Sequence, residues 1–161
     1  MSTITETRSI WFVDSYGRVI VSADESEGRL SVVEVSGARG QMPPLHVHRT
    51  DDEVFHVIEG EITVWNGGET VRLRAGDTAF APRDVPHTYR VESDGARWLA
   101  IGSPGGLDCY FAAIGRPAGS DRVPPATIAP DLEAAEALER ETGFRIDLLV
   151  PPGALPSGSS D

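Results

Sequence analysis

The sequence contains no lysine, a single cysteine and no long apolar segment. All 14 basic residues are arginines, which excludes chemistry through a lysine Schiff base. With Cys109 alone the chain cannot form an internal disulfide, so we expect a reducing compartment and a buried, structural thiol. No apolar run approaches the roughly 20 residues of a membrane helix, and Met1–Ile10 lacks the basic and apolar parts of a signal peptide. These absences predict a soluble cytoplasmic protein.

The size and charge of the chain narrow its class further. Its 161 residues, 40% hydrophobic and 24% charged, are enough for one hydrophobic core and few for two, so we expect one domain over residues 1–161. The formal net charge of -11 argues against nucleic acid and anionic membranes as partners, because both are bound by basic surfaces.

Short apolar runs recur between glycine and proline turns up to residue 102, with no long helical pattern among them. Asn66-Gly67 between two alternating runs predicts a tight hairpin, and Asp14–Gly17 predicts another turn. The pattern is typical of an all-β sandwich or barrel over residues 10–102. The expected strands are Ile10–Val13, Arg18–Ser22, Arg29–Val35, a strand that ends at Glu59, Glu61–Trp65, Glu69–Leu73, Thr78–Ala81, His87–Val91 and Arg97–Gly102.

In residues 103–161 the pattern of short apolar runs gives way to helix signals. These signals predict a short helical arm followed by a tail. Pro130, early acidic residues and Gly143 are start and stop signals for one longer helix. The expected elements are a helix Leu107–Ile114 capped by Gly115, a helix Asp131–Thr142, a final strand Phe144–Val150 and a frayed tail Pro151–Asp161, with a polar arm Ser2–Arg8 at the other end.

Three of the four histidines and one glutamate fall at positions suited to one metal ion. His46 and His48 are two residues apart, so on a strand both imidazoles leave the same face. Glu53 opens the next apolar run and His87 begins a later strand. Imidazoles together with a carboxylate suit first-row divalent metals. His56, three residues after Glu53, points to the opposite face, and we expect it to be structural or solvent-facing.

Two segments around these residues resemble the motifs of the cupin family. Gly40–Gly60 looks like the first motif without a gap or substitution, and Gly76–His87 resembles the second, at the usual separation. The family usually has Gly where this chain has Asp84, and Asn where it has Val91. We expect Asp84 to adopt the turn conformation of a glycine and Val91 to alter the end of the strand rather than the site.

The resemblance to cupins implies a small antiparallel β-barrel of jelly-roll type that holds one divalent transition metal. The implied ligands are His46, His48, Glu53 and His87, and their chemistry does not choose among Fe(II), Ni, Mn, Co and Zn. The layout looks most like the single-domain, bacterial quercetin 2,3-dioxygenase-like group. That likeness implies an oxidoreductase that uses O2 to cleave a flavonol-like or other polyphenolic enol, with Glu53 as both ligand and catalytic base. It also implies a homodimer.

A pocket for an aromatic substrate is a further expectation. Phe55 and Val57 share the face of Glu53, and Tyr89 shares that of His87, so these three residues are candidates to line it. Phe55 and Val57 fit equally well as barrel core, and we expect Trp65 and Trp98 in the core or at an interface.

Three alternatives to a dioxygenase stay open. The first is a non-oxidative cupin, such as an aromatic polyketide cyclase or an isomerase, in which the metal acts as a Lewis acid. The second is a non-catalytic cupin that binds a small molecule or a metal. The third is a barrel that keeps the ligand-type residues only for packing.

Overall fold

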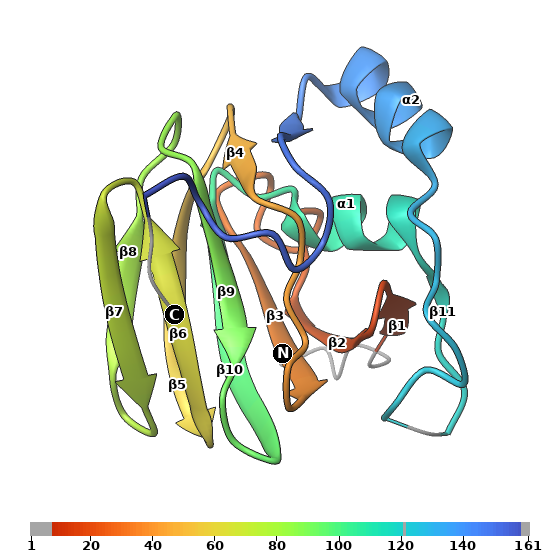
Figure 1. Ribbon diagram of the computed structural model, residues 1–161. Helices are drawn as coiled ribbons and strands as arrows, with labels where there is room; N and C mark the ends of the chain where they lie inside the picture. Colours follow the sequence, from red (N-terminus) through yellow and green to blue (C-terminus); the bar gives the residue numbers. More distant parts are fainter. Residues whose placement is uncertain (1–7, 121, 159–161) are drawn as a thin grey trace.

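The computed structural model describes residues 8–120 and 122–158, which form two antiparallel β-sheets and two helices (Figure 1). The larger sheet has the strand order β11-β1-β2-β3-β10-β5-β8. Its strands are β1 (Ser9–Phe12), β2 (Ser15–Val21), β3 (Ser31–Ala38), β5 (Asp52–Glu59), β8 (Thr78–Ala81), β10 (Gly95–Ser103) and β11 (Arg116–Pro117).

The smaller sheet has the order β12-β4-β9-β6-β7. Its strands are β4 (His46–His48), β6 (Glu61–Asn66), β7 (Glu69–Arg74), β9 (His87–Val91) and β12 (Ile146–Leu148). The predicted hairpin at Asn66-Gly67 is confirmed, since β6 and β7 pair from Asn66 opposite Glu69 back to Glu61 opposite Arg74. The predicted final strand is present but shorter, and it pairs with β4, almost 100 residues earlier in the chain.

The core lies between the inner faces of the two sheets. Alternate residues of β5 are buried, as period-two alternation requires of a strand with one face in the core. Trp65 and Trp98, which the sequence predicts in the core or at an interface, are both in the core at 1% exposure. The all-β prediction is therefore confirmed, although the sheets are separate and do not join into a closed barrel.

The predicted turn at Asp14–Gly17 is wrong. The chain turns at Val13 and Asp14, where Val13 has a φ of 53°, and β2 already begins at Ser15. Gly17 lies inside β2 because the ring of Phe12 packs over it: a Cβ at Gly17 would be 2.9 Å from Cε1 of Phe12. The glycine allows a close approach here rather than a turn.

Both predicted helices are present, as α1 (Leu107–Ile114) and α2 (Leu132–Thr142). The Asp131 carboxylate accepts a hydrogen bond of 2.9 Å from the backbone N–H of Ala134, and Gly143 ends α2 in the left-handed conformation. The ring of Phe111 on α1 stacks on that of Phe12, with centroids 4.2 Å apart. This contact fixes α1 against the N-terminal strands.

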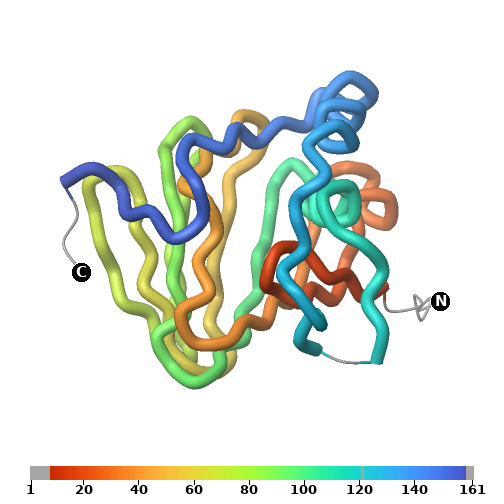
Figure 2. Tube along the Cα trace, turned by 45° about the vertical axis from the view of Figure 1, so that its right-hand side comes forward, coloured from red at the N-terminus to blue at the C-terminus, as the bar shows by residue number. Residues whose placement is uncertain are grey.

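The C-terminal segment crosses from the helical side of the molecule to the smaller sheet. After β12 the chain passes in front of β9 and approaches β6 and β7 (Figures 1 and 2). Residues 151–158 contain no helix or strand, and residues 159–161 of the predicted tail lie outside the described part of the chain, as do residues 2–7 of the predicted arm.

Cys109 contradicts the prediction of a buried thiol, because the side chain is exposed on α1. Its neighbours Asp108 and Tyr110 take the buried positions of that helix instead. Among the described residues, no helix is long and apolar enough to span a membrane.

Candidate metal centre and adjoining cavity

The two sheets bring one glutamate and three histidines together. His46 and His48 lie on β4 and His87 begins β9, all in the smaller sheet, where His46 is paired directly with His87. Glu53 comes from β5 in the larger sheet and faces them across the interior. One ligand-type atom from each of these four side chains lies within 4.8 Å of the others.

Short contacts define the centre of the cluster. Oε2 of Glu53 is 2.9 Å from Nε2 of His87 and 3.2 Å from Nε2 of His48. The imidazole centroids are 4.4 to 5.2 Å apart. His48, Glu53 and His87 are buried, and His46 is partly exposed. The Nε2 atoms of His48 and His87 thus converge on the same carboxylate oxygen.

The other ring nitrogen of each histidine faces an oxygen atom. Nδ1 of His46 donates to the carbonyl of Pro44 at 2.7 Å, and Nδ1 of His87 is 3.2 Å from the carbonyl of Val85. Nδ1 of His48 lies 3.0 and 3.1 Å from the two carboxylate oxygens of Asp51, a residue with no exposed surface. Donation from Nδ1 leaves the Nε2 lone pair free, the state in which an imidazole ligates a metal.

The electrostatics of the cluster favour the ligating forms of His46 and Glu53. Burial, reinforced by the charges of His87 and His48, lowers the pKa of His46 well below its ordinary value, so its ring is neutral at pH 7. Burial alone would raise the pKa of Glu53, but His48 and His87 outweigh it and the pKa is lowered. For His48, the carboxylates of Glu53 and Asp51 outweigh the lowering by burial and raise the pKa.

These donors fit a first-row divalent metal. The cluster offers three imidazole nitrogens and one carboxylate oxygen, with each imidazole oriented by an oxygen partner on the opposite side of the ring. Four protein ligands leave room for a substrate atom on a five- or six-coordinate ion. The donor types suit several metals and do not select one.

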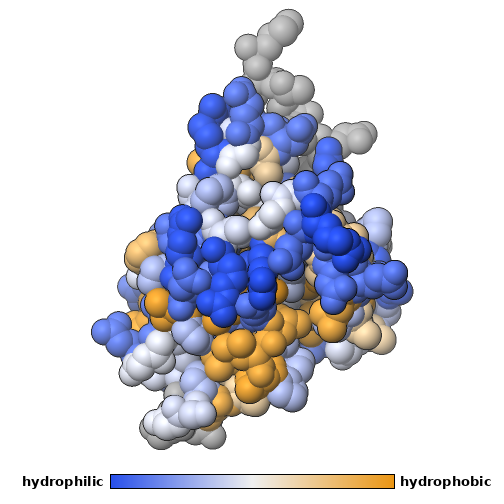
Figure 3. Space-filling view, turned by 90° about the horizontal axis from the view of Figure 1, so that it is seen from above, coloured by the Kyte–Doolittle hydropathy of each residue, from blue (hydrophilic) through white to orange (hydrophobic). Residues whose placement is uncertain are grey.

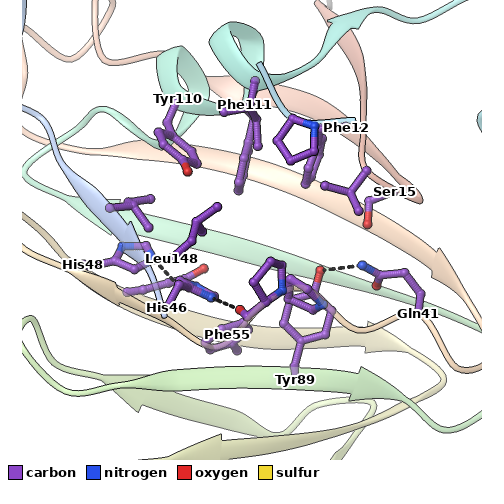
Figure 4. A pocket seen from close by; sticks show the side chains of 17 residues that line it. Phe12, Ser15, Gln41, His46, His48, Phe55, Tyr89, Tyr110, Phe111 and Leu148 are labelled. Carbon is purple, nitrogen blue, oxygen red and sulfur yellow. Dashed lines mark hydrogen bonds and ion pairs between the residues drawn. The ribbon is translucent and has the colours of Figure 1, made fainter. Parts of the chain in front are cut away.

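A cavity adjoins the cluster and is lined mainly by apolar side chains (Figure 4). His46, His48 and Glu53 form part of its wall. Its other wall comes from α1, the N-terminal strands and β12, so the cavity lies between the sheets and the helical arm. Five aromatic side chains line it: Phe12, Phe55, Tyr89, Tyr110 and Phe111.

The predicted pocket residues divide into two groups. Phe55 and Tyr89 line the cavity, with their ring centroids 5.9 Å apart. Val57 is fully buried in the core and is not among the lining residues. His56 points to the other face of β5, where its Nδ1 is 2.9 Å from Oγ1 of Thr78. Its predicted exclusion from the cluster is thus confirmed.

Sequence reasoning missed several residues of the cavity and its surroundings. Asp51, three residues after His48, had a local signal, because a carboxylate at that spacing can reach a ligand imidazole. Ser15, Gln41 and Phe111 had none, since they come from a strand start, a loop and a helix that only tertiary packing brings together. Asp84 has a φ of 63°, the glycine-like turn conformation expected for it.

Part of the chain matches a known protein family. Residues 33–102 match a family described as "Cupin domain". The chain is 28% identical over 104 residues to a protein named quercetin 2,3-dioxygenase from Bacillus subtilis (strain 168), and 31% identical over 85 residues to one of the same name from Aspergillus japonicus. The alignments cover 65% and 50% of this chain but 31% and 24% of those proteins, so the chain spans less than a third of their lengths.

Solved structures share the fold. A crystal structure described as an RmlC-like cupin from Shewanella frigidimarina superposes with a TM-score of 0.57 at 24% sequence identity. The match covers 68% of this chain and 94% of that chain. The fold of this chain is therefore similar to that of a solved structure described as a cupin.

Proposed function

Because the chain carries a cupin domain, we propose that it is a metal-dependent dioxygenase that cleaves a flavonol-like or other polyphenolic enol. The observation that carries the proposal is the position of the Glu53 carboxylate. It touches two candidate ligand histidines and also lines the cavity that has five aromatic side chains in its wall. The aromatic side chains of this wall support a planar, polyphenolic substrate, because aromatic rings pack well on one another.

Glu53 is placed to act as the base. Its lowered pKa keeps it ionised at neutral pH, so a carboxylate oxygen can accept the proton of an enol hydroxyl that enters the cavity. The resulting carboxylic acid can return that proton to the product. When bound, a divalent transition metal would supply Lewis acidity for the deprotonated enol and redox chemistry toward O2.

The aromatic wall positions the substrate and excludes water. Phe55 extends from the centre, with its ring 5.9 Å from that of His87, and Phe111 closes the opposite side from α1. Apolar side chains on both sides give a flat ring system surfaces to pack against. Exclusion of water strengthens electrostatic interactions around the developing anion.

Oxygen dependence tests the proposal. The metal-loaded protein is expected to bleach flavonols in air, with O2 consumed in step with substrate and both atoms of labelled O2 in the product. Glu53→Gln is expected to lower the rate at least a hundredfold, whereas Glu69→Gln, at an exposed position on β7, serves as the matched control. Equal turnover under strict anaerobiosis would refute the dioxygenase and favour a cyclase or isomerase. Metal binding without turnover of a wide substrate panel would favour a non-catalytic role.

A further inference from the structure

A small polar group interrupts the apolar wall of the cavity. It consists of Ser15 at the start of β2, Gln41 in the loop after β3, and Tyr89 on β9. Nε2 of Gln41 donates to the hydroxyl of Tyr89 at 3.3 Å. We call these three residues the polar end of the cavity; Figure 4 shows them at the opposite side from His46 and His48.

The polar end has hydrogen-bonding capacity that the described part of the chain does not use. Oε1 of Gln41 and Oγ of Ser15 are buried, and neither has a hydrogen-bond partner of ordinary geometry there. All three side chains are at least nine-tenths buried, at 0% exposure for Ser15, 8% for Gln41 and 7% for Tyr89. Buried polar atoms normally have a partner, so unpaired ones in a cavity wall indicate a ligand group.

The polar end carries no charge. The phenol of Tyr89 is buried and accepts a hydrogen bond from the Gln41 amide, and a phenol is neutral at pH 7. Serine and glutamine are neutral as well. An uncharged group with a hydrogen to donate suits the free Gln41 carbonyl, because an ionised group would meet no countercharge.

Phe55 separates the polar end from the metal-binding cluster. Its ring is 5.9 Å from the His87 ring at an interplanar angle of 84°, and 5.9 Å from the Tyr89 ring at 64°. A ligand that reaches both ends must therefore pass along an aromatic wall. A flat, apolar ring system can lie along this wall without placing any polar atom of its own where it has no hydrogen-bond partner.

We propose that the polar end recognises a neutral hydroxyl on the substrate ring farthest from the metal-binding oxygens, so that the site selects ring-hydroxylated aromatic enols over unsubstituted ones. The inference rests on the proposed function, since it takes the cavity to be the substrate site. It assigns Gln41 as acceptor and Ser15 as supporting partner of that hydroxyl. Tyr89 holds the Gln41 amide in place through its own hydrogen bond.

Binding of matched flavonols tests this assignment without catalysis. The probes are a flavonol with no ring hydroxyls and its two monohydroxylated isomers, with the hydroxyl on the pendant phenyl ring or at the far edge of the fused rings. Dissociation constants are measured by absorbance titration of the metal-loaded protein under anaerobic conditions. We expect one isomer to bind about tenfold more tightly than the unsubstituted probe, the gain from one neutral hydrogen bond at a buried site.

Variants of Ser15 and Gln41 test whether these two residues cause the tighter binding of the hydroxylated probe. The double variant Ser15→Ala with Gln41→Met is expected to reduce the affinity ratio to near one, and Ser15→Ala alone gives a milder test if the double variant unfolds at a lower temperature. Thr70→Val removes a hydroxyl from β7, outside the cavity, and is the control. Equal affinity for all three probes, or a preference that persists in the variants, would overturn the inference and leave the proposed function standing. Binding of no probe by the folded, metal-loaded protein would overturn both.

Discussion

Removal of the Asp51 carboxylate tests how the candidate metal ligands are held. Asp51 lies in the turn between β4 and β5, has no exposed surface, and places both carboxylate oxygens within 3.1 Å of Nδ1 of His48. The carboxylate fixes the His48 ring so that Nε2 faces Glu53, 3.2 Å away. Asp51→Ala removes this support without changing a ligand, and Asp51→Asn keeps one acceptor oxygen but removes the charge.

The magnitude follows from the role of such a partner. Loss of the group that orients a metal-bound imidazole typically weakens metal binding about 10- to 100-fold, or about 1.4 to 2.7 kcal/mol. We expect Asp51→Ala to lie in that range and Asp51→Asn to lose less. Asp51→Ala also leaves the buried Nδ1–H of His48 without an acceptor, which is expected to cost about 1 to 3 kcal/mol of folding free energy.

Calorimetric titration with Co(II) or Zn(II) after chelator treatment measures the metal affinity, and urea unfolding measures the stability. Asp94→Asn is the matched control, because its side chain is fully exposed and pairs only with Arg39 among the described residues. The control is expected to bind metal as the unchanged protein does. A folded Asp51→Ala protein with unaltered affinity would refute the positioning role, and weaker binding by Asp94→Asn would show that net charge alone is responsible.

Three further predictions address stability. Metal added to the chelator-treated protein should stabilise it by about 2.7 kcal/mol at a hundredfold excess over Kd; a metal-independent thermal midpoint would count against the site. Burial alone would raise the pKa of Glu34, but Arg18 and Arg97 outweigh burial and lower this pKa below 4.5. The ion pairs of Glu34 therefore stabilise the fold above pH 4.5, and this contribution is lost as the pH falls through the lowered pKa. Glu34→Gln should therefore destabilise the protein by about 1 to 3 kcal/mol at pH 7 in urea unfolding and by less near pH 3. Asp131→Ala should cost about 1 kcal/mol through loss of the α2 cap, whereas Asp131→Asn should retain most of the stability; equal losses in the two variants would contradict a capping role.

The end surface of the molecule is mixed in character. Viewed from the end that carries α2 and β4, an apolar area lies within a largely hydrophilic surface (Figure 3). Leu148 of β12 lines the cavity and is 39% exposed, and Leu149, which follows it, is 46% exposed. This places an apolar part of the cavity wall at the surface of the molecule.

Local pattern in the sequence was enough for most of the helices and strands and for the residue types of the candidate ligands. Two-residue spacing puts His46 and His48 on one face of a strand, and the Asn66-Gly67 turn defines a hairpin, because both depend only on neighbouring residues. The caps of α2 are also local. The same logic set His56 apart from the cluster, since alternation along β5 alone decides its face.

Only the tertiary structure decided which segments far apart in the chain contact one another. β12 pairs with β4, and α1 packs against the N-terminal strands. Together these contacts enclose a cavity whose polar end consists of Ser15, Gln41 and Tyr89. The sequence predicts a turn at Gly17 because it does not reveal that the Phe12 ring packs over this residue. Such contacts depend on register and packing between residues far apart in the chain, and local propensity does not determine them. The residue types of the candidate metal ligands are thus a property of the sequence. The meeting of these residues across two sheets and the shape of the adjoining cavity are properties of the fold.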